Sequence, residues 1–197
     1  AQSLLHSQGY YDGTASFEMD REATPVAVVL TLSPGRRYSL GRADVYYDPE
    51  PVVPQYFRNR QREVGFWGLE TEPVPPPSFP AVLPGVAIGK PTAADDLLAA
   101  VNALPEALRR QGYPMAKIAD TNYTLDREAS RLNADILVRP GPPALMGRIE
   151  VRGAKEVNAE YIQRLAPWTV AEEPWNSDMV EDYANKLRGL GLFRTVE

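Results

Sequence analysis

One pattern of residues occurs twice in this chain in the same register, and this repeat constrains the fold more than any other feature. Pro34-Gly35 is followed after five residues by Gly41-Arg42, and two residues later by Val45. The same spacing returns with Pro140-Gly141, Gly147-Arg148 and Val151. An internal repeat of this kind indicates a row of small modules, each stabilised by contact with its neighbours. No active site is needed to explain the pattern.

A helix-ending signal precedes each copy and also opens a third one. It lies at residues 5–10 and 108–113, where a leucine is followed by polar residues and a Gly-Tyr pair, and a related stretch lies at 187–193. Glycine is the usual residue beyond the end of a helix because it tolerates a left-handed backbone. The chain starts inside the first such helix and stops where a third strand should start, so we interpret it as a fragment.

The composition is that of an ordinary folded protein. Apolar residues make up 44% of the chain and charged residues 24%, and 21 basic against 26 acidic side chains leave a net charge of −5. This balance argues against a nucleic-acid partner. The absence of cysteine excludes disulfides and cysteine-ligated metals, and no run of about 20 apolar residues could span a bilayer.

The middle copy predicts the order of elements most clearly. We expect a strand over 41–47, a helix that ends at Gly112 with a kink or a break near Ala103 caused by Pro105, and strands over 116–125 and 133–139. In the first copy, Ala15, Phe17 and Met19 alternate with polar residues and are expected in the core, beside a central strand over 26–32. In the third, a strand over 148–152 precedes helices capped by Asn158 and Asn176. The repeated unit is strand, helix, helix, strand, strand.

This order resembles that of the polypeptide-transport-associated (POTRA) domains of outer-membrane assembly factors of the TamA/BamA type, and the TamA-like ones in particular. The resemblance rests on residues 147–153, Glu160-Tyr161-Ile162, residues 187–193, and residues 89–113. It implies an α+β fold with a three-stranded mixed sheet covered by two helices, repeated in an elongated array. The predicted modules are 1–38, the end of a first module; 39–141, a complete second one; and 142–197, a third without its last two strands.

Residues 48–84 depart from this resemblance. Prolines are concentrated there, including Pro75-Pro76-Pro77, and proline neither extends a helix nor donates to a sheet. We therefore interpret 48–84 as an insertion within the second module. Phe66 and Trp67 in it are candidate anchors for a partner, although packing against the chain itself explains them as well.

An open three-stranded sheet leaves one outer strand unpaired, where an extended peptide can add as a further strand. The resemblance places that edge on the strand after the second helix, and it yields two sets of candidate residues. The first set is Thr14, Ala15, Ser16, Phe17, Glu18 and Met19. The second set is Ala116, Lys117, Ile118, Ala119, Asp120 and Thr121.

The resemblance also implies a location and partners. It predicts a periplasmic scaffold tethered to the outer membrane by its own C-terminal β-barrel, which docks nascent outer-membrane β-barrel proteins and a TamB-like inner-membrane tether or accessory subunits. The alternative is a POTRA module of a two-partner secretion transporter or a division-type periplasmic domain. No cofactor is expected, and we predict that the chain is not an enzyme, because its single histidine, His6, has no triad or metal partners at a suitable spacing and is expected on the surface.

Overall fold

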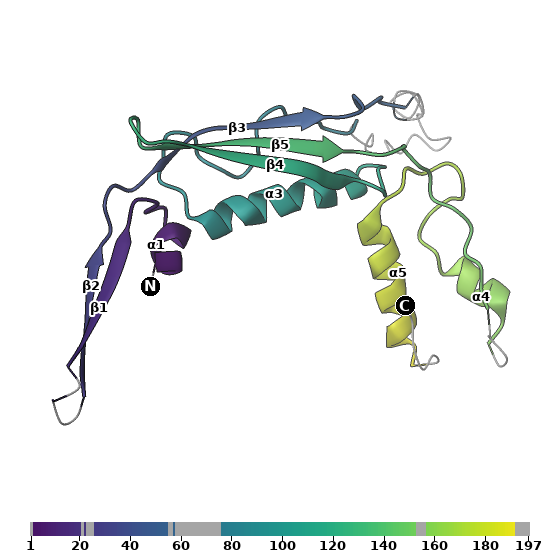
Figure 1. The fold of residues 1–197 in the computed structure, drawn as a ribbon. Coiled ribbons are helices and arrows are strands. Elements are labelled where there is room, and N and C mark those ends of the chain that lie inside the picture. Colours follow the sequence, from purple (N-terminus) through teal and green to yellow (C-terminus); the bar gives the residue numbers. More distant parts are fainter. Residues whose placement is uncertain are drawn as a thin grey trace. The chain divides into compact units, whose positions relative to one another are not determined.

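The computed structural model describes residues 2–20, 22, 26–54, 57, 76–152 and 157–191 (Figure 1). The chain divides into two compact units, each built from separate stretches of sequence. One unit contains Ala1–Tyr46, Pro80–Leu104 and Ile118–Val138, and the other contains Tyr47–Phe79, Pro105–Lys117 and Arg139–Glu197. These units do not follow the sequence repeat, so the division into three successive modules stays a prediction.

The larger of the two described sheets is mixed and has three strands, and we call it the central sheet. It contains β3 (Ser39–Tyr47), β4 (Lys117–Asp126) and β5 (Arg131–Arg139) in the order β3-β5-β4. The arrowheads of β3 and β5 point the same way, and helix α3 (Ala94–Arg109) runs along one face (Figure 1). The predicted α+β fold class is confirmed, and each predicted strand of this sheet is found close to its predicted bounds.

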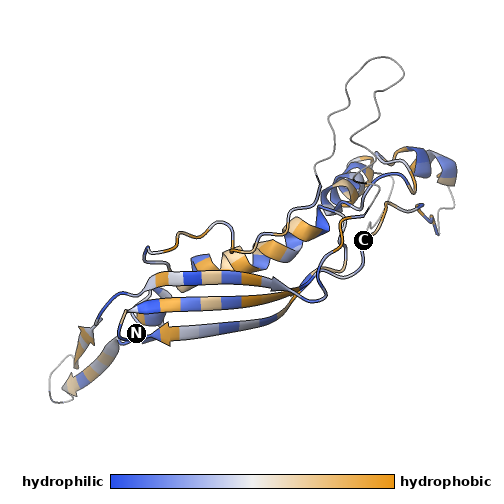
Figure 2. Cartoon of the chain, turned by 90° about the horizontal axis from the view of Figure 1, so that it is seen from above, coloured by the Kyte–Doolittle hydropathy of each residue, from blue (hydrophilic) through white to orange (hydrophobic). Residues whose placement is uncertain are grey.

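The core of the central sheet comes from alternate residues of β5 and from three residues of β3. Every second residue of β5 from Leu132 to Val138 is buried, and Leu40, Ala43 and Val45 of β3 are buried as well. Apolar and polar colours accordingly alternate along these strands in Figure 2. Alternation of this kind is typical of a sheet with one covered face.

Helix α3 supplies the other side of that core, and it is not broken at Pro105. Its buried face is formed by Leu97, Val101, Leu104 and Leu108. Of the kink or break predicted near Ala103, the break is wrong, since the helix continues through Pro105 to Arg109, and the kink stays a prediction. Proline removes one backbone hydrogen bond, and the buried leucines on either side of it hold the helix in place at that turn.

The N-terminal residues form a separate two-stranded ribbon. Helix α1 (Gln2–Ser7) precedes β1 (Thr14–Asp20) and β2 (Ala27–Ser33), which pair antiparallel with Phe17 opposite Leu30. All of β2 is exposed, and the side chains of Phe17 and Met19 are 69% and 47% exposed. The predicted central strand and the predicted core positions of Phe17 and Met19 are therefore wrong, because among the described residues β1 and β2 have only each other as strand partners.

The C-terminal residues form two short helices around a small core. Helices α4 (Ala159–Arg164) and α5 (Ser177–Gly189) start at the predicted caps, where the side chains of Asn158 and Asn176 accept from the amides of Glu160 and Asp178. Ile162, Tyr183 and Leu187 are buried between them. The strand predicted over 148–152 is wrong, because these residues have no strand partner in the described chain.

The repeat offers a matched pair of residues for testing burial. Ile136 and Leu30 each lie four residues before a Pro-Gly pair, yet Ile136 is 0% exposed and Leu30 is 53% exposed. Ile136→Ala should lower the free energy of unfolding by about 2–5 kcal/mol, and Leu30→Ala by less than about 0.5 kcal/mol. Urea denaturation followed by circular dichroism measures both. Equal losses would show that the exposed face of β2 is covered in solution.

Candidate functional site

The two outer strands of the central sheet differ in what lies beyond them. β4 is at one end of the strand order, and in the part of the chain that the structure describes it pairs only with β5. An outer strand of this kind presents a row of backbone N–H and C=O groups. We call this side of β4 the open edge.

The other outer strand, β3, is covered by its own chain. Residues 81–91, which we call the cover segment, run antiparallel to it through the bridges of Asp44 with Val82 and of Ser39 with Pro91. The Val45 amide donates to the Ala81 carbonyl over 2.8 Å, and the Leu40 amide donates to the Lys90 carbonyl over 2.9 Å. The outer side of β3 is thus occupied at both ends of the strand.

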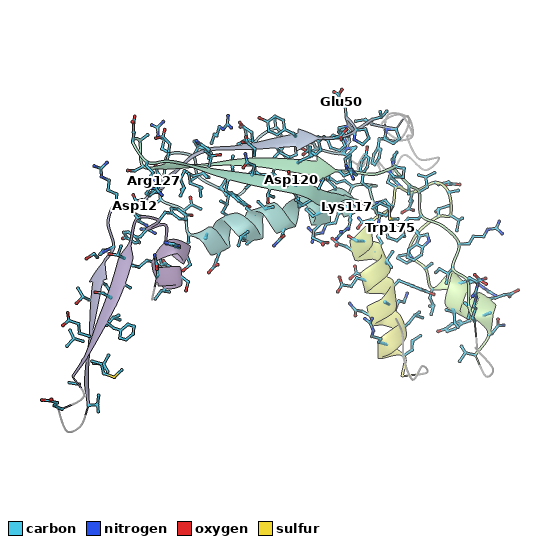
Figure 3. The ribbon with its side chains drawn as sticks, viewed as in Figure 1. Asp12, Glu50, Lys117, Asp120, Arg127 and Trp175 are labelled. Carbon is cyan, nitrogen blue, oxygen red and sulfur yellow. The ribbon has the colours of Figure 1, made fainter. Side chains whose placement is uncertain are left out.

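Most residues of the second predicted set lie on the open edge. Lys117, Ile118, Ala119, Asp120 and Thr121 belong to β4, and Lys117 and Asp120 are exposed on it (Figure 3). Ala116 precedes the strand and is fully buried. The structure therefore brings this set together on an outer strand, with Ala116 as a buried support.

One side chain already occupies a backbone donor of β4. The Thr121 amide donates to Oδ1 of Asp120 over 2.9 Å. A charged residue that bonds to the backbone of an outer strand reduces uncontrolled pairing with other chains. Asp120 therefore competes for this amide with any strand that adds to β4.

The start of β4 is held by the end of α3. Nη2 of Arg109 donates to the Ala116 carbonyl over 2.9 Å, and the buried Tyr113 donates from its hydroxyl to the Val52 carbonyl over 2.8 Å. Arg109 also forms an ion pair with Glu106 one turn earlier. The bond to Ala116 positions the backbone directly before β4. It does not use the side chains of the open edge.

A backbone contact at the end of each helix recurs with the repeat. Gly9 and Gly112 have φ of 86° and 100°, the left-handed region that favours glycine. The Gly9 carbonyl accepts from the Tyr38 amide over 2.9 Å, and the Gly112 carbonyl accepts from the Ala144 amide over 2.8 Å. The sequence predicted the two helix ends, and the structure adds the bond that each makes to the segment after the Pro-Gly pair.

Polar contacts strengthen the first of these junctions. The buried Tyr38 donates from its hydroxyl to Asp12 over 2.7 Å, and Asp12 also lies 4.0 Å from Nε of Arg127 in the turn between β4 and β5 (Figure 3). The hydrogen bond to Asp12 raises the pKa of Tyr38. At the other end of β3, burial raises the pKa of Tyr47 to about 12, so both phenols stay neutral at physiological pH.

The remaining predicted site residues are placed differently. Thr14 to Met19 lie on β1, an outer strand of the ribbon, and their alternating side chains are largely exposed. Phe66 and Trp67 lie outside the described residues. The surface position expected for His6 is wrong in part, because its Nε2 is buried without a hydrogen-bond partner.

The cover segment is the feature that sequence reasoning missed. The sequence pattern places its prolines in, or next to, an irregular insertion, because proline weakens any strand prediction. The available signal was the spacing of prolines before a helix, since Pro91 and Pro174 each lie three residues ahead of the first residue of α3 and α5. That spacing identifies 91 and 174 as equivalent positions of the repeat.

Neither a metal-binding cluster of side chains nor a helix suited to crossing a membrane is found among the described residues. Among the described residues, no group of three or more His, Cys, Asp or Glu side chains is placed to hold a metal ion. Within the same residues, none of the helices combines the length and the apolar character that crossing a membrane requires.

The fold is that of solved POTRA structures. The chain matches a crystal structure of Haemophilus influenzae BamA POTRA3-5 with a TM-score of 0.55 and 19% identity, over 98% of this chain and 68% of that one. It matches BamA from Haemophilus ducreyi lacking POTRA domains 1-3 with a TM-score of 0.54 and 15% identity, over 81% of this chain and 25% of that one. No protein-family model matches the chain, and no curated protein matches it in sequence.

The helix-closing glycine gives a test of the junction. Gly112→Ala should lower the free energy of unfolding by about 1–2 kcal/mol, because a Cβ strains the left-handed backbone. Gly147→Ala is the control, since Gly147 has no positive φ and no atom within 4 Å of an added Cβ. Urea titrations of the two variants compare them. The role of Gly112 is refuted when both variants unfold at the same urea concentration.

Proposed function

We propose that this chain is part of a periplasmic POTRA array in an outer-membrane β-barrel assembly or translocation factor of the TamA/BamA type. In this role it is a non-catalytic scaffold that docks nascent outer-membrane proteins and partner subunits. The fold it shares with the two BamA structures supports the class. The TamA-like assignment, a TamB-like partner and a C-terminal barrel as tether rest on the sequence resemblance.

The observation that carries this proposal is the open edge of β4. A strand that adds there is held by main-chain hydrogen bonds, which every amino acid except proline supplies. Such a site accepts many different extended segments, as a scaffold for many unfolded barrel proteins must. The exposed, mixed side chains of Lys117, Ala119 and Asp120 demand no single partner sequence.

Adjacent amides of a strand face opposite edges, which supplies a matched pair of variants. We infer that the Thr121 amide faces away from β5, because it bonds to the side chain of Asp120. Thr121→Pro should keep the fold and weaken strand addition about fivefold, the effect of losing roughly 1 kcal/mol of hydrogen bonding. Asn122→Pro should instead remove a β4–β5 bond and destabilise the sheet.

The probe is a synthetic peptide of alternating apolar and polar residues, the pattern of an outer-membrane β-strand. Photo-crosslinking and fluorescence anisotropy measure its binding, and circular dichroism reports the fold of each variant. Unchanged binding to a folded Thr121→Pro variant contradicts the proposal that β4 receives the strand.

A further inference from the structure

The outer side of β3 carries the same kind of backbone groups as β4, and the cover segment uses donors and acceptors in both directions. Near the start of the strand, the Leu40 carbonyl accepts from the Gly89 amide over 2.6 Å while the Leu40 amide donates to Lys90. Near its end, the Ala43 carbonyl accepts from the Leu83 amide over 2.8 Å while the Val45 amide donates to Ala81. The strand is therefore paired on this side as it would be by a neighbouring strand.

The same closure recurs in the third copy of the repeat. Met146, five residues after its Pro-Gly pair as Leu40 is after the first, donates from its amide to the Glu173 carbonyl over 2.7 Å. Its carbonyl accepts from the Ala171 amide over 2.9 Å. Lys90 and Glu173 each directly precede the bridging proline, so the bond from the amide is equivalent in the two copies, whereas the bond to the carbonyl comes from a residue one position further from that proline in the third copy.

Proline keeps the cover segment, and the residues around Pro174 in the third copy, from presenting new open edges. Leu145 bridges to Pro174, and the residues on either side of that proline, Glu173 and Trp175, both bond toward the 144–146 segment. Pro174 must then face the opposite way, where an N–H would be offered to another chain, and proline has none. Pro91 holds the equivalent position opposite Ser39.

We propose that the cover segment is a permanent guard of β3, which confines strand addition on the central sheet to β4. The part of this inference that concerns a client strand rests on the proposed function. The pairing of the cover segment with β3 does not. A client strand adds to one side of the sheet only, so its direction and register are set by β4 alone. The guard remains in place whether or not a client is bound.

A disulfide across the guard tests this inference. Asp44 and Val82 form a bridge whose hydrogen bonds lie on either side of it, from Val45 to Ala81 and from Leu83 to Ala43. A pair of this kind has Cα atoms about 4.5 Å apart, which is within the range for a disulfide. The chain has no cysteine, so the double variant Asp44→Cys/Val82→Cys can form only this link.

The first measurement needs no client. Hydrogen exchange of the Val45 amide is compared between the oxidised and the reduced double variant, with Asp44→Cys alone as the control. We expect the two rates to agree within about threefold, since a guard that stays closed gains little from a covalent lock. Exchange at least ten times slower in the oxidised form would overturn the inference, because it would show that the guard opens.

The second measurement adds the alternating peptide described above. We expect equal affinity in the oxidised and reduced forms, with new protection on β4 amides and none on Val45. A tenfold loss of affinity on oxidation would overturn the inference, because the client would then be displacing the guard. If the peptide binds neither form, the proposed function fails, and the exchange rate of Val45 still decides whether the guard is permanent.

Discussion

The structure depends on a backbone hydrogen bond that joins the glycine at the end of a helix to the segment leading into the next strand. The carbonyl of Gly9 accepts from Tyr38, and that of Gly112 accepts from Ala144. Glycine can turn its carbonyl to this position because it tolerates a positive φ. Two residues later, the chain begins to pair with its cover, as Leu40 does with Lys90. The register of β3, and with it the central sheet, follows from this bond.

The central sheet is asymmetric because, among the described residues, the outer side of β3 is paired by the cover segment and the outer side of β4 is not paired. Closure of β3 uses backbone groups and outward-facing prolines, so it persists whatever side chains surround it. In the described part of the chain β4 pairs only with β5, so its other side presents a row of backbone groups, and the Asp120 side chain bonds to one of them. This asymmetry is what makes strand addition at a single place physically reasonable. A sheet with two open edges would also be prone to pair with copies of itself.

The ribbon and the central sheet show how one sequence pattern acquires two environments. Leu30 and Ile136 occupy equivalent positions, but only Ile136 has a helix and a third strand beside it. Apolar side chains on a two-stranded ribbon bury little surface by themselves, and such ribbons are marginally stable in water. The exposure of β2 therefore reflects the lack of a covering layer among the described residues. Its local structure is still that of a strand.

The sequence determined most of the elements through the repeat, the glycines that end helices and the caps Asn158 and Asn176, whereas the expectation that β4 is an outer strand came from the resemblance to POTRA domains. Only the tertiary structure decided which alternating residues are buried. Phe17 alternates like a core residue but is exposed, because a strand's own pattern cannot supply the second layer that would cover it. It also decided that β3 is closed, because the bond from Leu40 to Lys90 joins residues distant in sequence. Periodicity reports the geometry of a strand, whereas covering an edge or a face requires a second segment whose position no local pattern encodes.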